Sequence, residues 1–220
     1  MSDPSARGAP VYRLERQAFD PLYLREVEHA LTRCEYVGAS PLGAEFVLTQ
    51  GFSLVFKRSS LGDVTDAFPF LRPFLEAAVF PASNAFFLNP LIMGHSSEVR
   101  PHIDCRLIAE QDLRIIPNLV SILYVRSEPE MSGGEITLGS GRPDAVSIKP
   151  STNNLLHFKG DIVHHVTAVE SDHKRVCLVC EQYRLPDHVL AGFPELDVIT
   201  DAGQFGDRTD ALGGPLEAVA

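Results

Sequence analysis

The sequence predicts a mainly β fold, either an all-β barrel or a double-sheet jelly roll, with N-terminal helices packed on the outside. Two observations support this prediction. The early part of the 220-residue chain shows helical periodicity, and from Asn84 onward short apolar or alternating runs follow one another between turn-rich pieces. Helices that come before the strands favour an arrangement in which the helices cover one side of the sheet.

The helical part is expected from about residue 20 to residue 81. Apolar residues recur at helical spacing after Asp20, a suitable N-cap residue that is followed by proline. A strand is predicted for 52–57. A second helix is expected to begin with Asp63 as its cap and to break near Pro69, because proline inside a helix removes a hydrogen bond.

The β core is expected from about residue 84 to residue 185. Glycine-, serine- and proline-rich pieces separate its apolar runs, and Gly133-Gly134 is expected to make a tight turn with positive φ. The predicted strands span 85–92, 119–125, 135–138, 155–158, 163–169 and 175–183.

The chain is expected to hold one domain, at 11–185, because its length and its 45% apolar content suit one sizeable core. Residues 1–10 are polar and lack the layout of a signal peptide, so they are interpreted as a disordered leader. The chain becomes acidic and glycine-rich after Pro186, and 186–220 is interpreted as an acidic C-terminal tail that is partly disordered or folded back over the core.

The bulk composition argues against several kinds of partner. A net charge of −10 argues against nucleic acid, and no apolar run reaches the roughly 18 residues of a membrane span. Four scattered cysteines are too few for a disulfide framework, so a reducing cytoplasm is the simplest location.

The first candidate metal ligands are His102 and Asp104. On a strand, residues two apart leave the same face, so an imidazole and a carboxylate at this spacing can bind one metal. His-x-Asp alone is a weak signal, because such pairs are common at protein surfaces. A histidine at 164 or 165 would complete two histidines and one carboxylate, the facial set of non-haem iron(II) oxygenases. Arg175 opens a later strand and suits bidentate capture of a carboxylate.

The stretch from about 84 to 183 resembles the prolyl-hydroxylase-like branch of the 2-oxoglutarate- and iron(II)-dependent oxygenases. The resemblance rests on the His-x-Asp pair at 102–104, on Gly133-Gly134-Glu135 after a strand, and on Phe158 followed six residues later by His164. It implies a double-stranded β-helix (jelly-roll) core. The family pattern has proline at Ala168 and asparagine at Arg126, so the chain departs from it at both positions.

The resemblance also implies cofactors and roles. His102, Asp104 and His164 would bind Fe(II), and His165 would face outward or lie at the rim of the site. Arg175 would hold the far carboxylate of 2-oxoglutarate, with Lys174 as the fallback. Tyr124 would donate its hydroxyl to the same carboxylate, although a half-buried structural tyrosine fits equally well. Cys177 and Cys180 would lie on opposite faces and serve packing.

The implied activity is that of a 2-oxoglutarate-dependent dioxygenase. It would use O2 to hydroxylate an unactivated C–H of an amino acid, a small metabolite or a peptide side chain, releasing succinate and CO2. Related halogenases have a small residue in place of Asp104, so the carboxylate implies hydroxylation or another oxidation such as desaturation. Segment 106–118 is long enough to form a lid over the substrate.

Two other kinds of function stay open. One is a cupin-type metalloenzyme that does not use 2-oxoglutarate, and the other is a non-catalytic sensing module on the same jelly roll. Arg175 speaks against both, because neither needs a carboxylate anchor. Arg100, Arg106 and Arg126 are weak candidates for contacts to an anionic substrate, since each is more often a solvated charge.

Overall fold

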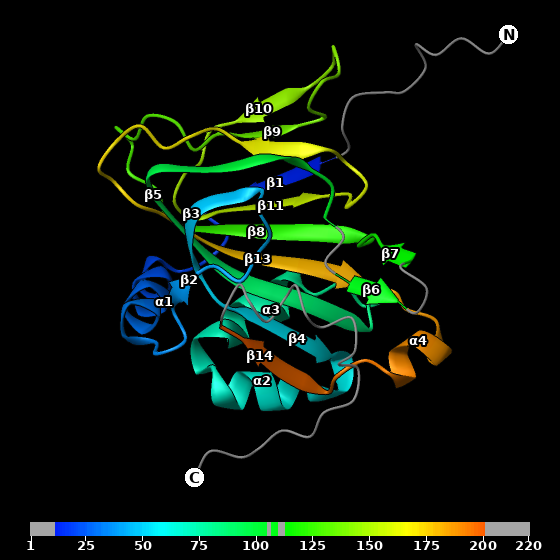
Figure 1. The fold of residues 1–220 in the computed structure, drawn as a ribbon. Helices are drawn as coiled ribbons and strands as arrows, with labels where there is room; N and C mark the ends of the chain where they lie inside the picture. The colour runs from blue at the N-terminus through cyan, green and yellow to red at the C-terminus, as the bar shows by residue number, and fades with distance from the viewer. Residues whose placement is uncertain (1–11, 105–106, 110–112, 201–220) are drawn as a thin grey trace, which may run out of the picture.

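The computed structural model describes residues 12–104, 107–109 and 113–200, and it confirms a mainly β fold with few helices (Figure 1). The helices are α1 (Pro21–Arg33), α2 (Leu61–Ala67), α3 (Arg72–Ala78) and α4 (Asp187–Ala191), with 3-10 turns η2 (Arg58–Ser60) and η3 (Pro69–Leu71). The strands are β1 (Tyr12–Arg16), β2 (Gly38–Ala39), β3 (Phe46–Gly51), β4 (Ser53–Lys57), β5 (Ala85–His102), β6 (Leu107–Ala109), β7 (Leu113–Ile115), β8 (Leu119–Arg126), β9 (Ile136–Leu138), β10 (Val146–Ile148), β11 (Asn154–Phe158), β12 (His164–Val166), β13 (Arg175–Tyr183) and β14 (Leu196–Ile199).

The long strand β5 joins two antiparallel layers. Its first half pairs with β13 on one edge and with β4 on the other, and β8, β11 and β1 follow beyond β13. Its second half pairs with β12 and β3, and β9 and β10 follow beyond β12. One strand therefore carries the chain from the larger layer into the smaller one.

A bulge in β5 marks the crossing. Along β3, Val47 pairs with Glu98 but Thr49 pairs with Met93, so four residues of β5 oppose a single residue of β3. The buried Ser97 hydroxyl holds this bulge, because it accepts from the Gly94 N–H at 3.0 Å and donates to the Leu48 carbonyl at 2.7 Å. Bulges bend a strand and increase its twist.

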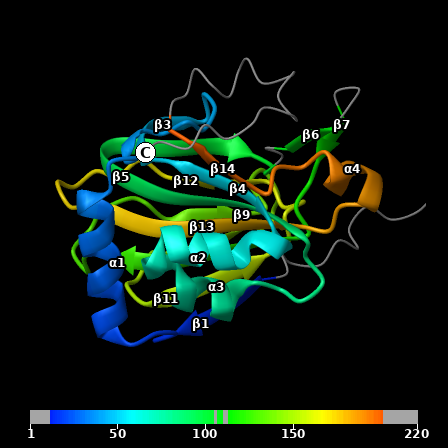
Figure 2. The same cartoon turned by 90° about the horizontal axis from the view of Figure 1, so that it is seen from below.

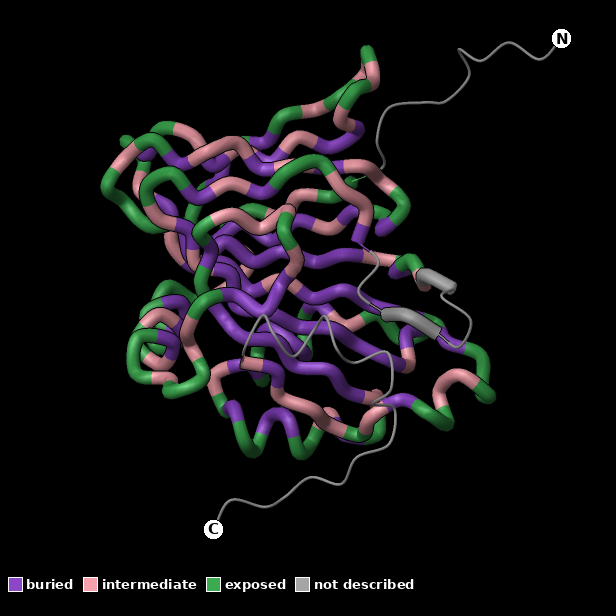
Figure 3. The backbone as a smooth tube through the Cα atoms, viewed as in Figure 1, coloured by how far each residue is buried: buried purple, intermediate pink, exposed green. Residues whose placement is uncertain are grey.

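Side chains alternate along these strands and divide the core in two. On β13, Cys177 belongs to the cluster between the two layers, whereas Leu178 and Cys180 belong to the cluster under the helices. β5 and β8 alternate in the same way, as period-2 strands require. Figure 3 shows the central strands mostly buried. The inner faces of both layers are therefore the place for a site.

Helices α1, α2 and α3 cover the outer face of the larger layer (Figure 2). Asp20 caps α1 as expected and accepts a hydrogen bond from the Leu22 N–H at 2.8 Å. Pro69 breaks the second helical stretch as expected, into α2, η3 and α3. The expected cap was wrong, because Asp63 lies inside the first turn of α2 and Ser60 is its N-cap residue.

Several strands were not identified from the sequence. β1, β2, β3, β10 and β14 are short or lack clear alternation, and β6 pairs with β7 within the segment expected to be a lid. The segment interpreted as a tail contributes α4 and β14, and β14 pairs with β4. The expected leader and residues 201–220 lie outside the described residues. Among the described helices none has the length and apolar character needed to cross a bilayer.

Candidate metal centre

The structure brings His102, Asp104 and His164 together at one end of the space between the layers. His102 is the last residue of β5 and His164 is the first residue of β12, and the two are paired across the smaller layer. Asp104 lies two positions after the end of β5, so the strand expected to carry both His102 and Asp104 ends at His102. One ligand atom from each of the three residues lies within 4.8 Å of the others. This is the two-histidine, one-carboxylate donor set of non-haem iron(II) sites.

Backbone carbonyls orient both imidazoles. The Nδ1 atom of His102 lies 2.8 Å from the Arg100 carbonyl oxygen, and that of His164 lies 3.0 Å from the Ile162 carbonyl oxygen. A carbonyl oxygen only accepts, so each Nδ1 carries the proton and each Nε2 presents its lone pair. The Nε2 atoms of His102 and His164 lie 3.2 Å and 3.6 Å from the two Asp104 carboxylate oxygens. All three donors therefore face one point.

The side chains of His164 and Asp104 are buried, and burial affects their suitability as metal ligands. His164 is 6% exposed and Asp104 4%. Burial lowers the pKa of His164, and the Asp104 carboxylate opposes that shift only in part. A neutral imidazole is the form that binds a metal. The rings of Phe46 and Phe158 pack edge-on against His102 and His164, with centroids 5.1 Å and 5.0 Å apart.

The described histidine pair at 164 and 165 divides as strand geometry requires. His164 is buried and faces the ligand set, while His165 is half-buried and lies 2.6 Å from the Ser140 hydroxyl through its Nδ1 atom. Neighbours on a strand point to opposite faces, so only one of the two can reach the metal position. The geometry favours His164.

Arg175 lies inside the barrel, 1% exposed, and its Nη1 atom is 2.8 Å from the Met93 sulfur. Its guanidinium carbon lies 5.1 Å from the centre of the Tyr124 ring. Burial raises the pKa of Tyr124 to about 12, although the Arg175 charge opposes that rise. Lys174 is exposed beside it. Tyr124 and Arg175 are thus a neutral donor and a cationic donor held in one place.

This pair has unused hydrogen-bonding capacity. Among the described residues, neither the Tyr124 hydroxyl nor the Arg175 Nε atom has a hydrogen-bond partner, although both are fully buried. A buried donor without a partner costs about 1–3 kcal/mol, so these two groups are candidates for contacts to a ligand. A carboxylate of 2-oxoglutarate fits these donors, as Fe(II) fits the three ligands.

One cavity is lined both by the three candidate metal ligands and by Arg175. Its polar lining comprises both histidines, Asp104, Arg175 and two residues that the sequence analysis did not identify, Asn89 and Glu181. The remaining walls are mostly aliphatic. Glu181 lies six residues after Arg175 on the same strand, so the period-2 rule applied to Arg175 would have found it.

The weak arginine candidates lie elsewhere or outside the described residues. Arg100 is exposed and pairs with Glu98 at 3.2 Å. Arg126 pairs with Glu28 at 2.6 Å and with Glu128 at 3.0 Å, which ties β8 to α1, and it does not line the cavity. Arg106 lies outside the described residues.

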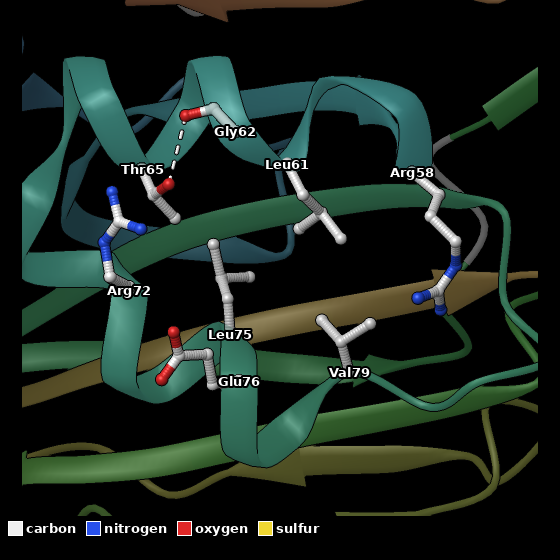
Figure 4. Close-up of a pocket in the computed structure, with 8 residues that line it drawn as sticks. All are labelled: Arg58, Leu61, Gly62, Thr65, Arg72, Leu75, Glu76 and Val79. Atoms are coloured by element: carbon white, nitrogen blue, oxygen red, sulfur yellow. Dashed lines mark hydrogen bonds between the residues drawn. The ribbon is translucent and has the colours of Figure 1, made fainter.

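A second hollow lies on the outer surface between η2, α2 and α3 (Figure 4). Its charged groups serve local structure. Arg72 pairs with Asp66 at 3.1 Å, and Arg58 donates to the Ser83 and Phe80 carbonyls. The only histidine–carboxylate set of metal-binding geometry among the described residues is the one at His102, and this hollow does not include it.

The fold of the chain is found in solved structures, although no family model and no curated protein matches the sequence. A prolyl-4-hydroxylase from Pseudomonas putida superposes with a TM-score of 0.56 at 12% identity, covering 80% of this chain and 94% of that one. A viral collagen prolyl hydroxylase from Paramecium Bursaria Chlorella virus-1 gives 0.54 at 12% identity, covering 84% and 98%.

Structures with bound cosubstrate have the same fold. HygX from Streptomyces hygroscopicus, solved with nickel and 2-oxoglutarate bound, superposes with a TM-score of 0.52 at 11% identity, covering 80% of this chain and 83% of that one. At such identities the superpositions establish the fold alone. It is the double-stranded β-helix fold of 2-oxoglutarate- and iron(II)-dependent oxygenases, as the sequence resemblance implied.

Proposed function

We propose that this chain, which has the fold of the 2-oxoglutarate- and iron(II)-dependent oxygenases, is itself such a dioxygenase. The observation that carries the proposal is the shared cavity. His102, Asp104 and His164 converge on one point, and Arg175 lies in the wall of the same cavity with unused donor capacity beside Tyr124. A cupin-type metalloenzyme or a sensing module would not need that second set.

Each residue has a defined part in the proposed reaction. His102, Asp104 and His164 would hold iron(II) through the two Nε2 atoms and the carboxylate, which converge on one point and line the cavity. Arg175 and Tyr124 would donate hydrogen bonds to the 5-carboxylate of 2-oxoglutarate. The guanidinium would also supply positive charge, and the neutral hydroxyl one further hydrogen bond. The Arg100 and Ile162 carbonyls hold the Nδ1 protons and keep both Nε2 lone pairs directed at the metal.

When bound, iron(II) and 2-oxoglutarate supply the oxidising chemistry with O2 and release succinate and CO2. Apolar side chains of the protein exclude water from the reacting groups. The cavity wall near the ligands carries Phe46, Val99, Val120, Ile122 and Val166, all apolar. A dry site strengthens the electrostatic contacts and suppresses side reactions. Asp104 fills the third ligand position, so we propose hydroxylation, or another oxidation such as desaturation, as the outcome.

The proposed substrate is an amino acid, another small metabolite or a peptide side chain. Proteins of this fold accept both kinds of molecule. One solved relative is a prolyl hydroxylase from Trichoplax adhaerens in complex with a hypoxia-inducible-factor peptide fragment. HygX is known in complex with hygromycin B. We propose a cytoplasmic location, which fits the free thiols of Cys34, Cys177 and Cys180.

An anaerobic titration with iron(II) and 2-oxoglutarate tests the cosubstrate claim. The wild-type protein should develop the weak visible charge-transfer band of the iron–2-oxoglutarate chelate. Arg175→Met should require at least about tenfold more 2-oxoglutarate for half-saturation, because a buried charge-assisted bond contributes about 1.5–3 kcal/mol. Lys174→Met, which removes the exposed neighbouring cation, is the matched control. Absence of the band in the wild type would sink the proposal.

A further inference from the structure

Asn89 is a polar residue of the cavity wall to which the proposed reaction assigns no part. It lies on β5 between Phe87 and Leu91, which belong to the cluster between the layers, so strand alternation directs its side chain to the same inner face. Asn89 is 3% exposed and lines the cavity together with the metal ligands. Its carboxamide makes no hydrogen bond within the described part of the chain. A buried amide without partners is costly, so this one is a candidate for a contact to a ligand.

Strand pairing separates Asn89 from Arg175 along the wall of the cavity. Arg175 and Val179 lie four residues apart on β13, and Asn89 is the β5 partner of Val179. Four strand residues span roughly 13 Å. Tyr124, the β8 partner of Cys177, comes from the level between them. The arginine and the asparagine are therefore two separate donors on one wall.

The metal ligands lie on the other side of Asn89. The ring of His164 packs edge-on against Phe158, with centroids 5.0 Å apart, and Phe158 is the strand partner of Val120. Val120 lies two residues from Ile122 on β8, and Ile122 is level with Asn89 through the strand between them. Along the cavity wall, Asn89 therefore lies between the arginine and the metal ligands.

The length of 2-oxoglutarate fits this separation. Its extended five-carbon chain, with one hydrogen bond at each carboxylate, spans roughly 13 Å from donor to donor. The levels of Arg175 and Asn89 differ by the same four strand residues. The two residues are therefore suited to the two ends of one dicarboxylate.

We propose that the Asn89 carboxamide donates a hydrogen bond to the metal-chelating 1-carboxylate of 2-oxoglutarate, so that the protein holds its cosubstrate at both ends. An amide N–H suits this place because it is a neutral donor, whereas a cationic side chain would repel the iron(II) ion beside it. The inference deepens the proposed function and rests on it for the placing of 2-oxoglutarate.

Anaerobic titration with two ligands tests this inference without turnover. 2-Oxopentanoate keeps the 1-carboxylate and 2-oxo group of 2-oxoglutarate but lacks the 5-carboxylate. With iron(II) present, Asn89→Leu should weaken binding of both ligands by a similar factor of about five to ten, because both keep the group that Asn89 contacts. Arg175→Met should weaken 2-oxoglutarate and leave 2-oxopentanoate within about twofold of the wild type.

The chelate band gives a second readout that a merely structural role would not change. Its maximum should shift in Asn89→Leu and stay in place in Arg175→Met, because only Asn89 contacts the chelating end. Asn118→Leu is the matched control. It removes an exposed carboxamide that accepts from the Arg184 N–H and does not line the cavity, so both ligands should bind as in the wild type.

Folding of the variants is checked by thermal unfolding of the apo protein. Asn89→Leu replaces a buried amide without partners by an alkyl group of similar size, so its melting temperature should not fall. Asn89→Ser keeps a shorter donor, and its affinity for both ligands should lie between those of the wild type and Asn89→Leu. It carries the test if Asn89→Leu does not fold.

The outcomes separate this inference from the proposed function. A normal wild-type band, with both ligands bound equally well by Asn89→Leu, would overturn the inference alone. Weaker binding of 2-oxoglutarate but not of 2-oxopentanoate in Asn89→Leu would also overturn it, because Asn89 would then serve the 5-carboxylate. A wild-type protein that forms no band with either ligand would overturn the oxygenase proposal and this inference together.

Discussion

At the scale of single residues, the site is determined by which atom each side chain presents. Two carbonyls hold the Nδ1 atoms of His102 and His164, so both Nε2 atoms are directed at the Asp104 carboxylate. The neighbouring His165 has the same chemistry but lies on the other face of its strand beside Ser140. Side-chain direction, more than residue type, therefore distinguishes the proposed ligand His164 from its neighbour His165.

The ligand assignment predicts unequal effects of three alanine variants. His102→Ala and His164→Ala should each weaken iron(II) binding by roughly a hundredfold or more, since even outer-shell changes cost 10- to 100-fold. His165→Ala should bind within about threefold of the wild type. Anaerobic iron(II) titration measures all three. Loss of binding in His165→Ala with retention in His164→Ala would reverse the assignment.

Tyr124 offers a second prediction at this scale. Its hydroxyl is buried without a partner among the described residues, so Tyr124→Phe removes a costly group from the ligand-free protein. The free energy of unfolding of the apo protein should stay level or rise by about 1 kcal/mol. The dissociation constant of 2-oxoglutarate should increase about tenfold. A clear loss of apo stability would mean that the hydroxyl is structural.

At the scale of elements, two backbone irregularities shape the cavity. The bulge at 94–97 carries β5 from one layer to the other and thereby brings His102 opposite His164. The turn at Gly133 and Gly134 has φ +78° at both residues, as the sequence predicted. An added Cβ at Gly134 would lie 3.5 Å from the Arg175 side chain, so this turn packs against Arg175.

The turn predicts a contrast between two glycines of similar φ. A Cβ at Gly133 would lie 1.8 Å from the Ala168 carbonyl oxygen, whereas one at Gly141, at φ +81°, would meet nothing within 4 Å. Gly141→Ala should cost about 1 kcal/mol through conformation alone. Gly133→Ala should cost at least about 2 kcal/mol more, because backbone must shift. Urea unfolding compares them, and equal losses would contradict the close contact.

At the scale of the whole molecule, a network of polar side-chain contacts links the N-terminal strand to the helices. Glu15 on β1 lies 3.5 Å from His157 Nε2, and His157 Nδ1 lies 2.8 Å from the Ser121 hydroxyl. The Gln182 side chain continues it, donating to Ser121 and to the Ala78 carbonyl at the end of α3. Ser121 is fully buried under the helices, so this network has a structural role, although it contains a serine, a histidine and a glutamate.

From this network of polar contacts we expect the stability of the protein to depend on pH. Burial lowers the pKa of His157 below its usual 6.5, and Glu15 offsets that only in part. The unfolded state then binds a proton more readily, so stability is full above pH 6.5 and falls as the pH drops below it. His157→Gln should flatten the fall in unfolding free energy between about pH 6.5 and pH 5, measured on the apo protein.

The exposed His188→Gln is the matched control and should keep the wild-type slope. His164, also buried with a lowered pKa, contributes to the same fall in both proteins, so the comparison isolates His157. If the unfolding free energy of His157→Gln fell with pH as steeply as that of the wild type, protonation of His157 would not be coupled to folding.

The sequence by itself determined the fold class, the capped helix after Asp20 and most strands of the larger layer, because local periodicity and turn residues encode these directly. It also contained the spacings that single out His102, Asp104, His164 and Arg175. It did not reveal β3 or β14, whose pairing depends on distant partners.

Only the tertiary structure decided which side chains share a cavity. The bulge in β5 and the pairing of β12 with β5 bring together residues about sixty positions apart, and no local pattern encodes that approach. In the folded protein Arg126 pairs with Glu28 and does not line the cavity, whereas Glu181 lies in the cavity wall. The physical reason is that periodicity sets the face of a strand, whereas long-range pairing sets what that face meets.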